Sequence, residues 1–328
     1  MGVGLVFDIG GTFIRGGVYD SEQGLYSFVV RQQAPNYKSK SRDELKGALM
    51  DQIQMIQTTL LNKYDNIEYE KIGISFPGPI NQNGIILNAP TLWGTKIKNI
   101  DLNHEMSKIF SAKPCFIIND ITAAGYRYLN TEMETFCILT ISSGVGGKIF
   151  YRGEALLDKE GMAGEVGHIY YRGKYNQLIC DCGEYGHIGS MASGRGIEQL
   201  ARCIIDQEEI KNTYFSSVLL QEQELTTYTI VKAIKEKDPL ALFILGEAVK
   251  PIVDIINTLI FTIGIQKFIL VGGFFNAVRE EYHSLLCEEI SRTNYRQLGK
   301  DNIENMILKG EDDDNNGLIG VGRYIFKH

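Results

Sequence analysis

The chain has 328 residues, of which 44% are hydrophobic and 22% charged, and its formal net charge is −7. This composition is typical of a soluble globular protein with room for two domains. The acidic balance gives no electrostatic footprint for nucleic acid. The start of the chain predicts no signal peptide, and Lys250 and Asp254 interrupt the longest apolar tract. We therefore expect a cytoplasmic protein without a membrane span.

A glycine turn near the N-terminus is the first motif that indicates chemistry. An apolar run containing Asp8 leads into Gly10-Gly11-Thr12, and Gly17–Tyr19 reads as the returning strand. Backbone N–H groups in such a turn can surround an anion, because glycine has no Cβ in the way. An aspartate beside the turn can hold hydrated magnesium. An ordinary glycine hairpin with a solvated aspartate is equally compatible with this stretch alone.

Strands and helices alternate through the next hundred residues. After a strand at Tyr26–Arg31, Ser41 and Glu44 have capping-box spacing at the start of an amphipathic helix. A strand at Lys71–Ser75 ends at Pro77-Gly78-Pro79, and we expect a loop over 88–94 around the single tryptophan. A helix over 101–110 with Asp101 as N-cap, a strand over 115–118 and a helix over 121–129 complete this part.

Asp120 lies at the junction between that last strand and helix, directly after Asn119. In open α/β sheets, ligands bind at the carboxyl ends of strands. Asp120 is therefore a candidate general base, although a helix N-cap aspartate is the simpler explanation from position alone.

The second half of the chain repeats the pattern of the opening, in which a strand, a glycine turn and a returning strand follow one another. A strand at Phe136–Ile141 runs into Ser142-Ser143-Gly144, and a strand returns at 148–151. A third glycine turn, Gly272-Gly273, follows a strand at 268–271. We expect helices over 195–206, 227–235 and 239–263, and a closely packing small-residue helix at 317–324. The two glycine hairpins, at Gly10-Gly11 and at Ser143-Gly144, predict two related domains around one nucleotide.

Six cysteines are present, and only Cys180 and Cys182 lie close together in the sequence. Four are scattered in apolar contexts and read as core residues. The close pair favours a metal site or a structural role over a disulfide.

Several of these motifs occur in an order that resembles the ROK family, which comprises repressors, open reading frames and kinases. They are Asp8-Ile9-Gly10-Gly11-Thr12, Asn119-Asp120, Ser143-Gly144-Val145-Gly146-Gly147, Gly164-Glu165-Val166-Gly167-His168 and Cys180-Asp181-Cys182-Gly183. The resemblance implies the two-domain, actin-like ATPase (ribonuclease H-like) fold with an interdomain cleft. We expect a first α/β domain over 1–120, completed by a helix at 313–328, and a second over 121–312.

The resemblance also implies an ATP-dependent sugar kinase with Mg²⁺, acting on a hexose or hexosamine hydroxyl, as a homodimer or homotetramer. Asp120 would be the general base. The sugar would contact Gly78, Asn119, Asp120, Glu165 and His168. The ATP phosphates would contact Asp8, Gly10, Gly11, Thr12, Ser143, Gly144, Gly272 and Gly273. A structural Zn²⁺ would be held by His168, Cys180, Cys182 and His187, with His187 where the family has a third cysteine.

A second departure concerns the substrate. Gly189 stands where family kinases carry a glutamate near the reducing end of the sugar, and Thr91 where family glucokinases have asparagine. We therefore expect a pocket altered at that end, suited to N-acetylmannosamine or a β-glucoside. The alternative is a plain glucokinase in which Glu184 or Arg195 replaces the contact. A sugar-sensing regulator is the alternative from another class, although Val3 already begins the first strand and leaves no room for a DNA-binding domain ahead of it.

Overall fold

The structure is a computed structural model that describes residues 2–35, 41–205, 213, 215, 225–293 and 299–328. It contains two compact units. The first unit comprises residues 1–134, 153–163 and 313–328, and the second comprises 135–152 and 164–312. The first unit thus includes residues 121–134 and 153–163, which the sequence analysis placed in the second domain.

The first unit is built on a mixed sheet whose central strands are β1 (Val3–Ile9), β5 (Lys71–Phe76) and β8 (Cys115–Asn119). β5 is parallel to both neighbours, so the carboxyl ends of all three strands meet at one edge. On the other side β2 (Phe13–Asp20) pairs antiparallel with β1, and β2 is followed by β3 (Gly24–Leu25) and β4 (Val30–Gln33). The observed order is β3-β2-β1-β5-β8, and β4 pairs with β2.

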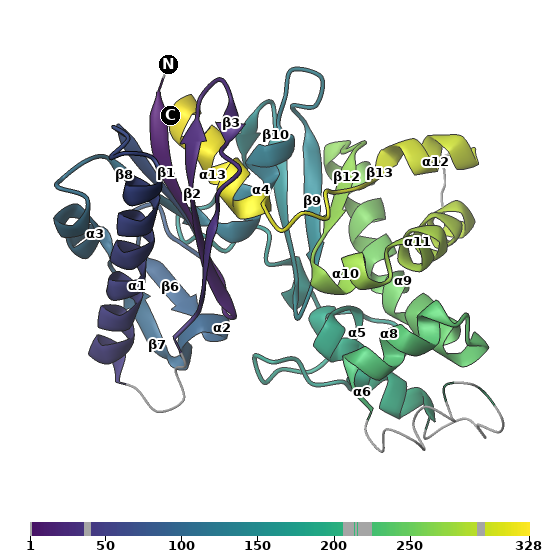
Figure 1. Cartoon of the computed structure of the whole chain (residues 1–328). Coiled ribbons are helices and arrows are strands. Elements are labelled where there is room, and N and C mark those ends of the chain that lie inside the picture. Colours follow the sequence, from purple (N-terminus) through teal and green to yellow (C-terminus); the bar gives the residue numbers. More distant parts are fainter. Residues whose placement is uncertain (1, 36–40, 206–212, 214, 216–224, 294–298) are drawn as a thin grey trace. The chain divides into compact units, whose positions relative to one another are not determined.

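Helices cover both faces of this sheet (Figure 1). Leu5 and Phe7 of β1 pack with α1 (Arg42–Lys63), whereas Val6 packs with α4 (Asp120–Tyr128) and α13 (Asn316–Lys327). This alternation is the expected two-residue period of a strand buried on both faces. The predicted capping box of α1 is present, with Ser41 accepting from the Glu44 N–H.

Glycines allow α13 to approach its neighbours closely. A Cβ on Gly320 would lie 1.6 Å from the Ala123 carbonyl oxygen of α4, and one on Gly322 would enter the Tyr19 ring. A Cβ on Gly317 would lie 2.2 Å from Oδ1 of Asp8. This confirms the close packing predicted for the C-terminal helix, and it explains why α4 belongs to the first unit.

The second unit repeats the core topology of the first. β9 (Phe136–Ile141) pairs antiparallel with β10 (Val145–Tyr151) and parallel with β12 (Phe268–Val271). β13 (Ile307–Lys309) extends the sheet beyond β12. A hairpin is thus followed by parallel strands in both units, as the repeated glycine motifs predict.

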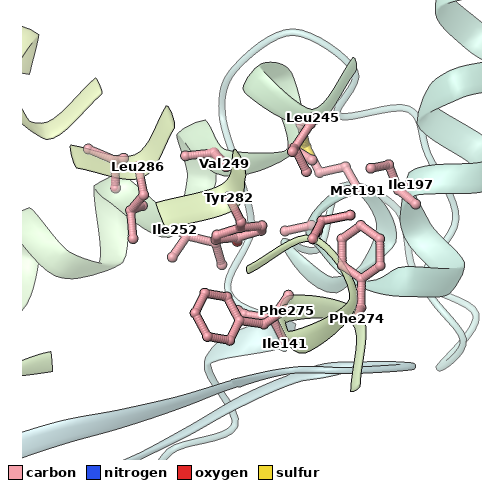
Figure 2. Packing of buried hydrophobic residues seen from close by; sticks show 14 of the residues in the cluster. Ile141, Met191, Ile197, Leu245, Val249, Ile252, Phe274, Phe275, Tyr282 and Leu286 are labelled. Carbon is pink, nitrogen blue, oxygen red and sulfur yellow. The ribbon is translucent and has the colours of Figure 1, made fainter. Parts of the chain in front are cut away.

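Helices of the second unit enclose a large apolar core (Figure 2). Side chains from α5 (Gly189–Ala192), α6 (Gly194–Ile205) and α9 (Pro239–Ile263) meet those of α10 (Gly273–Ala277) and α11 (Arg279–Thr293). The described residues of this unit also form α8 (Thr227–Lys235) and α12 (Lys300–Met306). Among the described residues, no helix combines the length and the apolar character needed to cross a bilayer.

Several sequence predictions need correction. Residues 88–94 contain α2 (Pro90–Trp93) rather than only a loop, because Trp93 packs against Phe76 and orders the segment between β6 (Ile86–Ala89) and β7 (Gly94–Ile100). Of the strand expected at Tyr26–Arg31, only Val30 and Arg31 lie in a strand, at the start of β4, and residues 26–29 connect β3 to β4.

Helix α3 (Asn103–Ile109) starts later than predicted, and Leu102, not Asp101, occupies its N-cap. Asp101 instead accepts a hydrogen bond from the Asn103 N–H. Residue 206, the predicted end of the helix now seen as α6, lies outside the described residues. A short strand β11 (Glu154–Ala155) and a three-residue 3-10 helix (Val166–His168) complete the elements.

Candidate active site and metal centre

Asp8 is fixed at the carboxyl end of β1 by two neighbours. It is in register with Arg15 on β2 and with Ser75 on β5. The Ser75 hydroxyl donates to Oδ1 at 2.7 Å, and Arg15 Nη2 donates to Oδ2 at 2.6 Å. Asp8 is only 8% exposed, and a buried carboxylate is tolerated when it is paired in this way. Both oxygens are therefore held in one orientation beside the first glycine turn.

That glycine turn is compact and faces outward. The Gly10 N–H donates to the Phe13 carbonyl at 2.9 Å, and a Cβ on Gly10 would lie 3.1 Å from the same oxygen. Gly11 and Thr12 are exposed. Their groups at the tip are accessible to a ligand, as a phosphate-binding turn requires.

Asn119 and Asp120 lie at the same edge of this sheet, where β8 meets α4. Asn119, not Asp120, is the N-cap: its Oδ1 accepts from the Ile121 and Thr122 N–H groups at 3.1 Å. Its Nδ2 donates to the Gly78 carbonyl at 2.9 Å and to Asp120 Oδ1 at 3.0 Å. The Asn119 amide is thus engaged within the chain and orients Asp120, and the sugar contact expected of Asn119 stays a prediction.

Gly78 has a structural reason to be glycine. Its φ is +95°, and a Cβ would lie 2.1 Å from the Asn88 carbonyl oxygen. Any contact that it makes with a substrate is therefore a backbone contact. Because Phe76 and Asn119 are register partners on β5 and β8, the Gly78 turn stands beside Asp120 at the strand ends.

The second unit brings the two later glycine turns together. Residues 142–144, which we call the serine turn, close through a 2.9 Å hydrogen bond from the Ser142 N–H to the Gly144 carbonyl. A Cβ on Gly273 would lie 3.7 Å from Ser142 Oγ. Gly272 has a φ of +113°, and its Cβ position is filled by the backbone of Ile141.

A cavity of about 390 Å³ opens beside these turns. Its walls combine both turns with residues of α6, α8 and α10: Ser142, Ser143, Gly194, Arg195, Thr227, Tyr228, Val231, Gly273, Phe274 and Ala277. Tyr228 is 71% exposed and offers an aromatic ring at the cavity. The cavity therefore places polar turn groups beside apolar and aromatic surface, a combination that suits a nucleotide.

Arg195 is the residue of this cavity that sequence reasoning assigned differently. Its Nε donates to the Ser143 carbonyl at 3.1 Å, and its Nη2 lies 2.8 Å from Oδ2 of Asp181. From the sequence, Arg195 is expected only as a substitute sugar contact. Its place directly after Ser193-Gly194 at the start of a helix was the available signal.

Glu165 and His168 lie on a turn that packs against β10. The Gly147 N–H donates to the Gly164 carbonyl at 2.8 Å, and Gly164 has a φ of +96°. A Cβ on Gly167 would lie 2.2 Å from the Val145 carbonyl oxygen. These contacts fix the turn on the strand that leaves the serine turn. His168 is exposed, and Glu165 is half-buried.

The four predicted metal ligands meet in one place. One ligand atom from each of His168, Cys180, Cys182 and His187 lies within 4.8 Å of every other. His168 Nδ1 is 3.4 Å from His187 Nδ1, which is 3.2 Å from Cys182 Sγ, and Cys180 Sγ is 3.9 Å from His168 Nδ1. Ligand atoms around tetrahedral zinc are roughly 3.3 to 3.8 Å apart, so this donor set fits Zn²⁺.

Residues 180–187, which we call the metal loop, form a tight turn. The Cys180 N–H donates to the Glu184 carbonyl, and the Gly183 N–H donates to the Cys180 carbonyl, both at 2.8 Å. Burial, together with the neighbouring Cys182, raises the pKa of the Cys180 thiol. A bound cation would oppose this shift, because a ligating thiol is deprotonated.

Gly189 opens α5 directly after the metal loop. A Cβ there would lie 3.2 Å from the Gly167 carbonyl oxygen, so the position adjoins the turn that carries Glu165 and His168. The position therefore borders the space beside the predicted sugar contacts of the second unit, and a Cβ there would be crowded against the Gly167 carbonyl. Nothing in the geometry directs Arg195 toward this space, because both of its contacts lie elsewhere.

Comparison with known proteins identifies the class. The ROK family model matches residues 4–326, and the chain belongs to the ROK family. A C(7)-cyclitol 7-kinase from Streptomyces hygroscopicus subsp. limoneus is 30% identical over 97% of this chain and 92% of that protein. An N-acetylmannosamine kinase from Haemophilus influenzae is 26% identical over 89% and 91%.

The fold also matches solved structures. A ROK family glucokinase from Streptomyces griseus, in complex with glucose and AMPPNP, superimposes with a TM-score of 0.72 at 20% identity, and all of both chains is covered. The predicted actin-like ATPase fold is confirmed. The relatives also support the predicted enzyme class, an ATP-dependent sugar kinase.

Proposed function

We propose that this chain transfers the γ-phosphoryl group of ATP to a hydroxyl, in the leading case a 6-hydroxyl, of a hexose-sized polyol ring altered at its reducing end. Such a hydroxyl is a weak nucleophile, and a positioned carboxylate accelerates its attack by accepting the proton. Phosphoryl transfer otherwise depends on positioning and charge neutralisation.

The observation that carries the proposal is the geometry of Asp120. Its carboxylate stands at the carboxyl end of β8 and is oriented by the Asn119 amide at 3.0 Å and the Ile121 N–H at 2.8 Å. Asn119 takes the N-cap position, so Asp120 is not needed as the cap residue, although its Oδ1 also accepts from the first turn of α4. In this proposal Asp120 accepts the hydroxyl proton, and Asn119 is a positioning residue.

The nucleotide is assigned to the glycine turns of both units. Asp8 is the residue that would hold Mg²⁺ through water, which suits a single fixed carboxylate. The cation would neutralise charge on the phosphates. The Gly10-Gly11-Thr12 turn would contact phosphate oxygens through N–H and hydroxyl groups. The cavity beside the serine turn, with Tyr228 at its wall, would receive the nucleoside.

Zinc in the metal loop would have a structural role. Four protein ligands leave no open position for a reacting group, which is typical of structural rather than catalytic zinc. Nδ1 of His168 faces the cluster, so Nε2 is the ring atom that would meet a sugar hydroxyl. Metal binding would thereby orient a sugar contact.

The absence of a side chain at Gly189 supports a substrate with a changed reducing end. A carboxylate there would hydrogen-bond hydroxyls near the anomeric carbon, and a substrate that lacks or substitutes them needs no such partner. The relatives that act on a cyclitol and on N-acetylmannosamine both have substrates that differ from glucose in this region of the ring. We therefore place a cyclitol beside the hexosamines and β-glucosides as a candidate acceptor.

An acceptor panel tests the proposal. ADP release would be measured with glucose, N-acetylmannosamine, cellobiose and a C7-cyclitol bearing a primary hydroxyl, because specificity lies in kcat/KM. We expect at least one altered ring to exceed glucose. A kcat/KM for glucose far above that of every other acceptor would instead support the alternative of a plain glucokinase. Sugar binding without any turnover would indicate a regulator.

A further inference from the structure

Arg195 joins two sites that the proposed function treats separately. Its guanidinium donates through Nε to the Ser143 carbonyl at 3.1 Å. Through Nη2 it pairs at 2.8 Å with Asp181, the residue between the two cysteines of the metal loop. The planar fork of an arginine can serve two acceptors at once in this way, whereas a lysine ammonium has no such fixed geometry.

The backbone supports the same connection. The Gly194 N–H donates to the Ser142 carbonyl at 2.7 Å, and Ser193 Oγ bonds the Gly189 carbonyl at 2.6 Å. The segment from His187 to Arg195 therefore begins at a metal ligand and ends on the serine turn. All of these residues belong to the second unit.

Arg195 also forms part of the cavity wall, so its position changes the space available to a ligand there. We propose that Arg195 is a positioning residue: Asp181 of the metal loop fixes its guanidinium, and the guanidinium holds the serine turn for nucleotide. The metal loop and the nucleotide cavity are then energetically coupled. This inference rests on the proposed function, which assigns the cavity to nucleotide and the loop to zinc.

Two physical constraints set the size of the effect. The Asp181 and Arg195 side chains are 58% and 53% exposed, and an exposed ion pair contributes little to stability. Coupling free energies between sites are nevertheless measurable and reciprocal. We therefore expect an altered nucleotide affinity with nearly unchanged thermal stability, which a merely structural role would not produce.

The variants are Asp181→Asn, Arg195→Lys and the double variant. Asp181→Asn keeps both cysteine ligands, and Arg195→Lys keeps the charge but not the fork. Glu184→Gln is the matched control, because Glu184 is exposed in the same metal loop and the substitution makes the same change in charge. Affinity for Mg·ADP would be measured by calorimetry on full-length protein, together with zinc content and Tm.

We expect each single variant to raise the Kd for Mg·ADP by about fivefold, the lower end of typical coupling effects. The double variant should bind Mg·ADP no more weakly than the single variant with the lower affinity, because both substitutions remove the same interaction. Glu184→Gln should bind as the wild type does. Removing zinc by chelation should weaken Mg·ADP binding in the wild type and less in Arg195→Lys.

Two results would overturn different claims. Wild-type affinity in Asp181→Asn and Arg195→Lys, with normal zinc content, would refute the coupling and leave the proposed function standing. Failure of the wild type to bind Mg·ADP would refute the nucleotide assignment itself.

Discussion

Gly320 of α13 lies directly against the carbonyl of Ala123 on α4, where a Cβ would stand 1.6 Å from the carbonyl oxygen. This contact joins the C-terminal helix to the helix that begins at Asp120. The candidate general base is therefore supported by residues far along the chain, which explains why both ends of the sequence belong to the first unit.

Gly320→Ala should destabilise the fold strongly. The added methyl group has to displace backbone, and overpacking of this kind costs about 1 to 3 kcal/mol or more. The matched control is Gly246→Ala in α9, where a Cβ would meet nothing within 4 Å and helix propensity favours alanine. Thermal and urea unfolding measure the stability of both variants. Equal stability of the two variants would contradict the packing described for α13.

Gly144→Ala tests the serine turn as part of the nucleotide site. A Cβ at Gly144 would meet nothing within 4 Å, so the variant should fold normally. Gly144 is a better test position than Gly10, because a Cβ on Gly10 would lie 3.1 Å from the Phe13 carbonyl oxygen and could disturb the turn. A bound phosphate would occupy that open space. Calorimetry should show weaker Mg·ADP binding with unchanged sugar affinity, and unchanged nucleotide affinity would exclude Gly144 from the site.

Zinc is expected at one ion per chain in protein purified without added metal. Chelation should lower Tm and sugar affinity together, because the ligands include His168 and metal binding is coupled to loop folding. Elemental analysis measures the zinc content, differential scanning calorimetry measures Tm, and titration calorimetry with the acceptor measures sugar affinity. A metal-free preparation with full activity and unchanged Tm would refute both the site and its role.

Gly189→Glu tests the altered reducing-end pocket. The carboxylate should improve kcat/KM for glucose relative to substituted acceptors, by the roughly 1 to 3 kcal/mol that a buried hydroxyl loses when it has no partner. Gly189→Ala is the control for crowding, since a Cβ already lies 3.2 Å from the Gly167 carbonyl. If both variants change all acceptors equally, position 189 does not face the substrate.

Local sequence patterns predicted much of the framework. Strong hydrophobic periodicity and clear caps placed β9, β12, α8 and α9 at their observed bounds. The four predicted metal ligands also lie close together, as the motif implied. Short elements such as α2 were missed, because the packing of Trp93 on Phe76 overrides the loop-like local sequence.

Contacts between distant residues were beyond sequence reasoning. The Asn119 amide is engaged by Gly78 and by its own helix, which no spacing rule revealed. The bridge from Arg195 to Asp181 and Ser143 likewise depends on three separate segments. The motifs thus predict which groups take part in the proposed chemistry, whereas the partners that orient each group are found only in the fold.

The most direct test of the account is turnover of Asp120→Asn with the best acceptor from the panel. Asp101→Asn is the matched control, because Asp101 also accepts a backbone N–H near the start of a helix, at 2.9 Å, but lies outside the candidate site. Steady-state ADP release would be compared with acceptor affinity from calorimetry. We predict that kcat falls at least ~10²-fold in Asp120→Asn, the usual scale for a general base, while acceptor affinity changes far less and the control keeps wild-type turnover. Near wild-type kcat in Asp120→Asn would contradict the account, because no proton acceptor would then be needed at the end of β8.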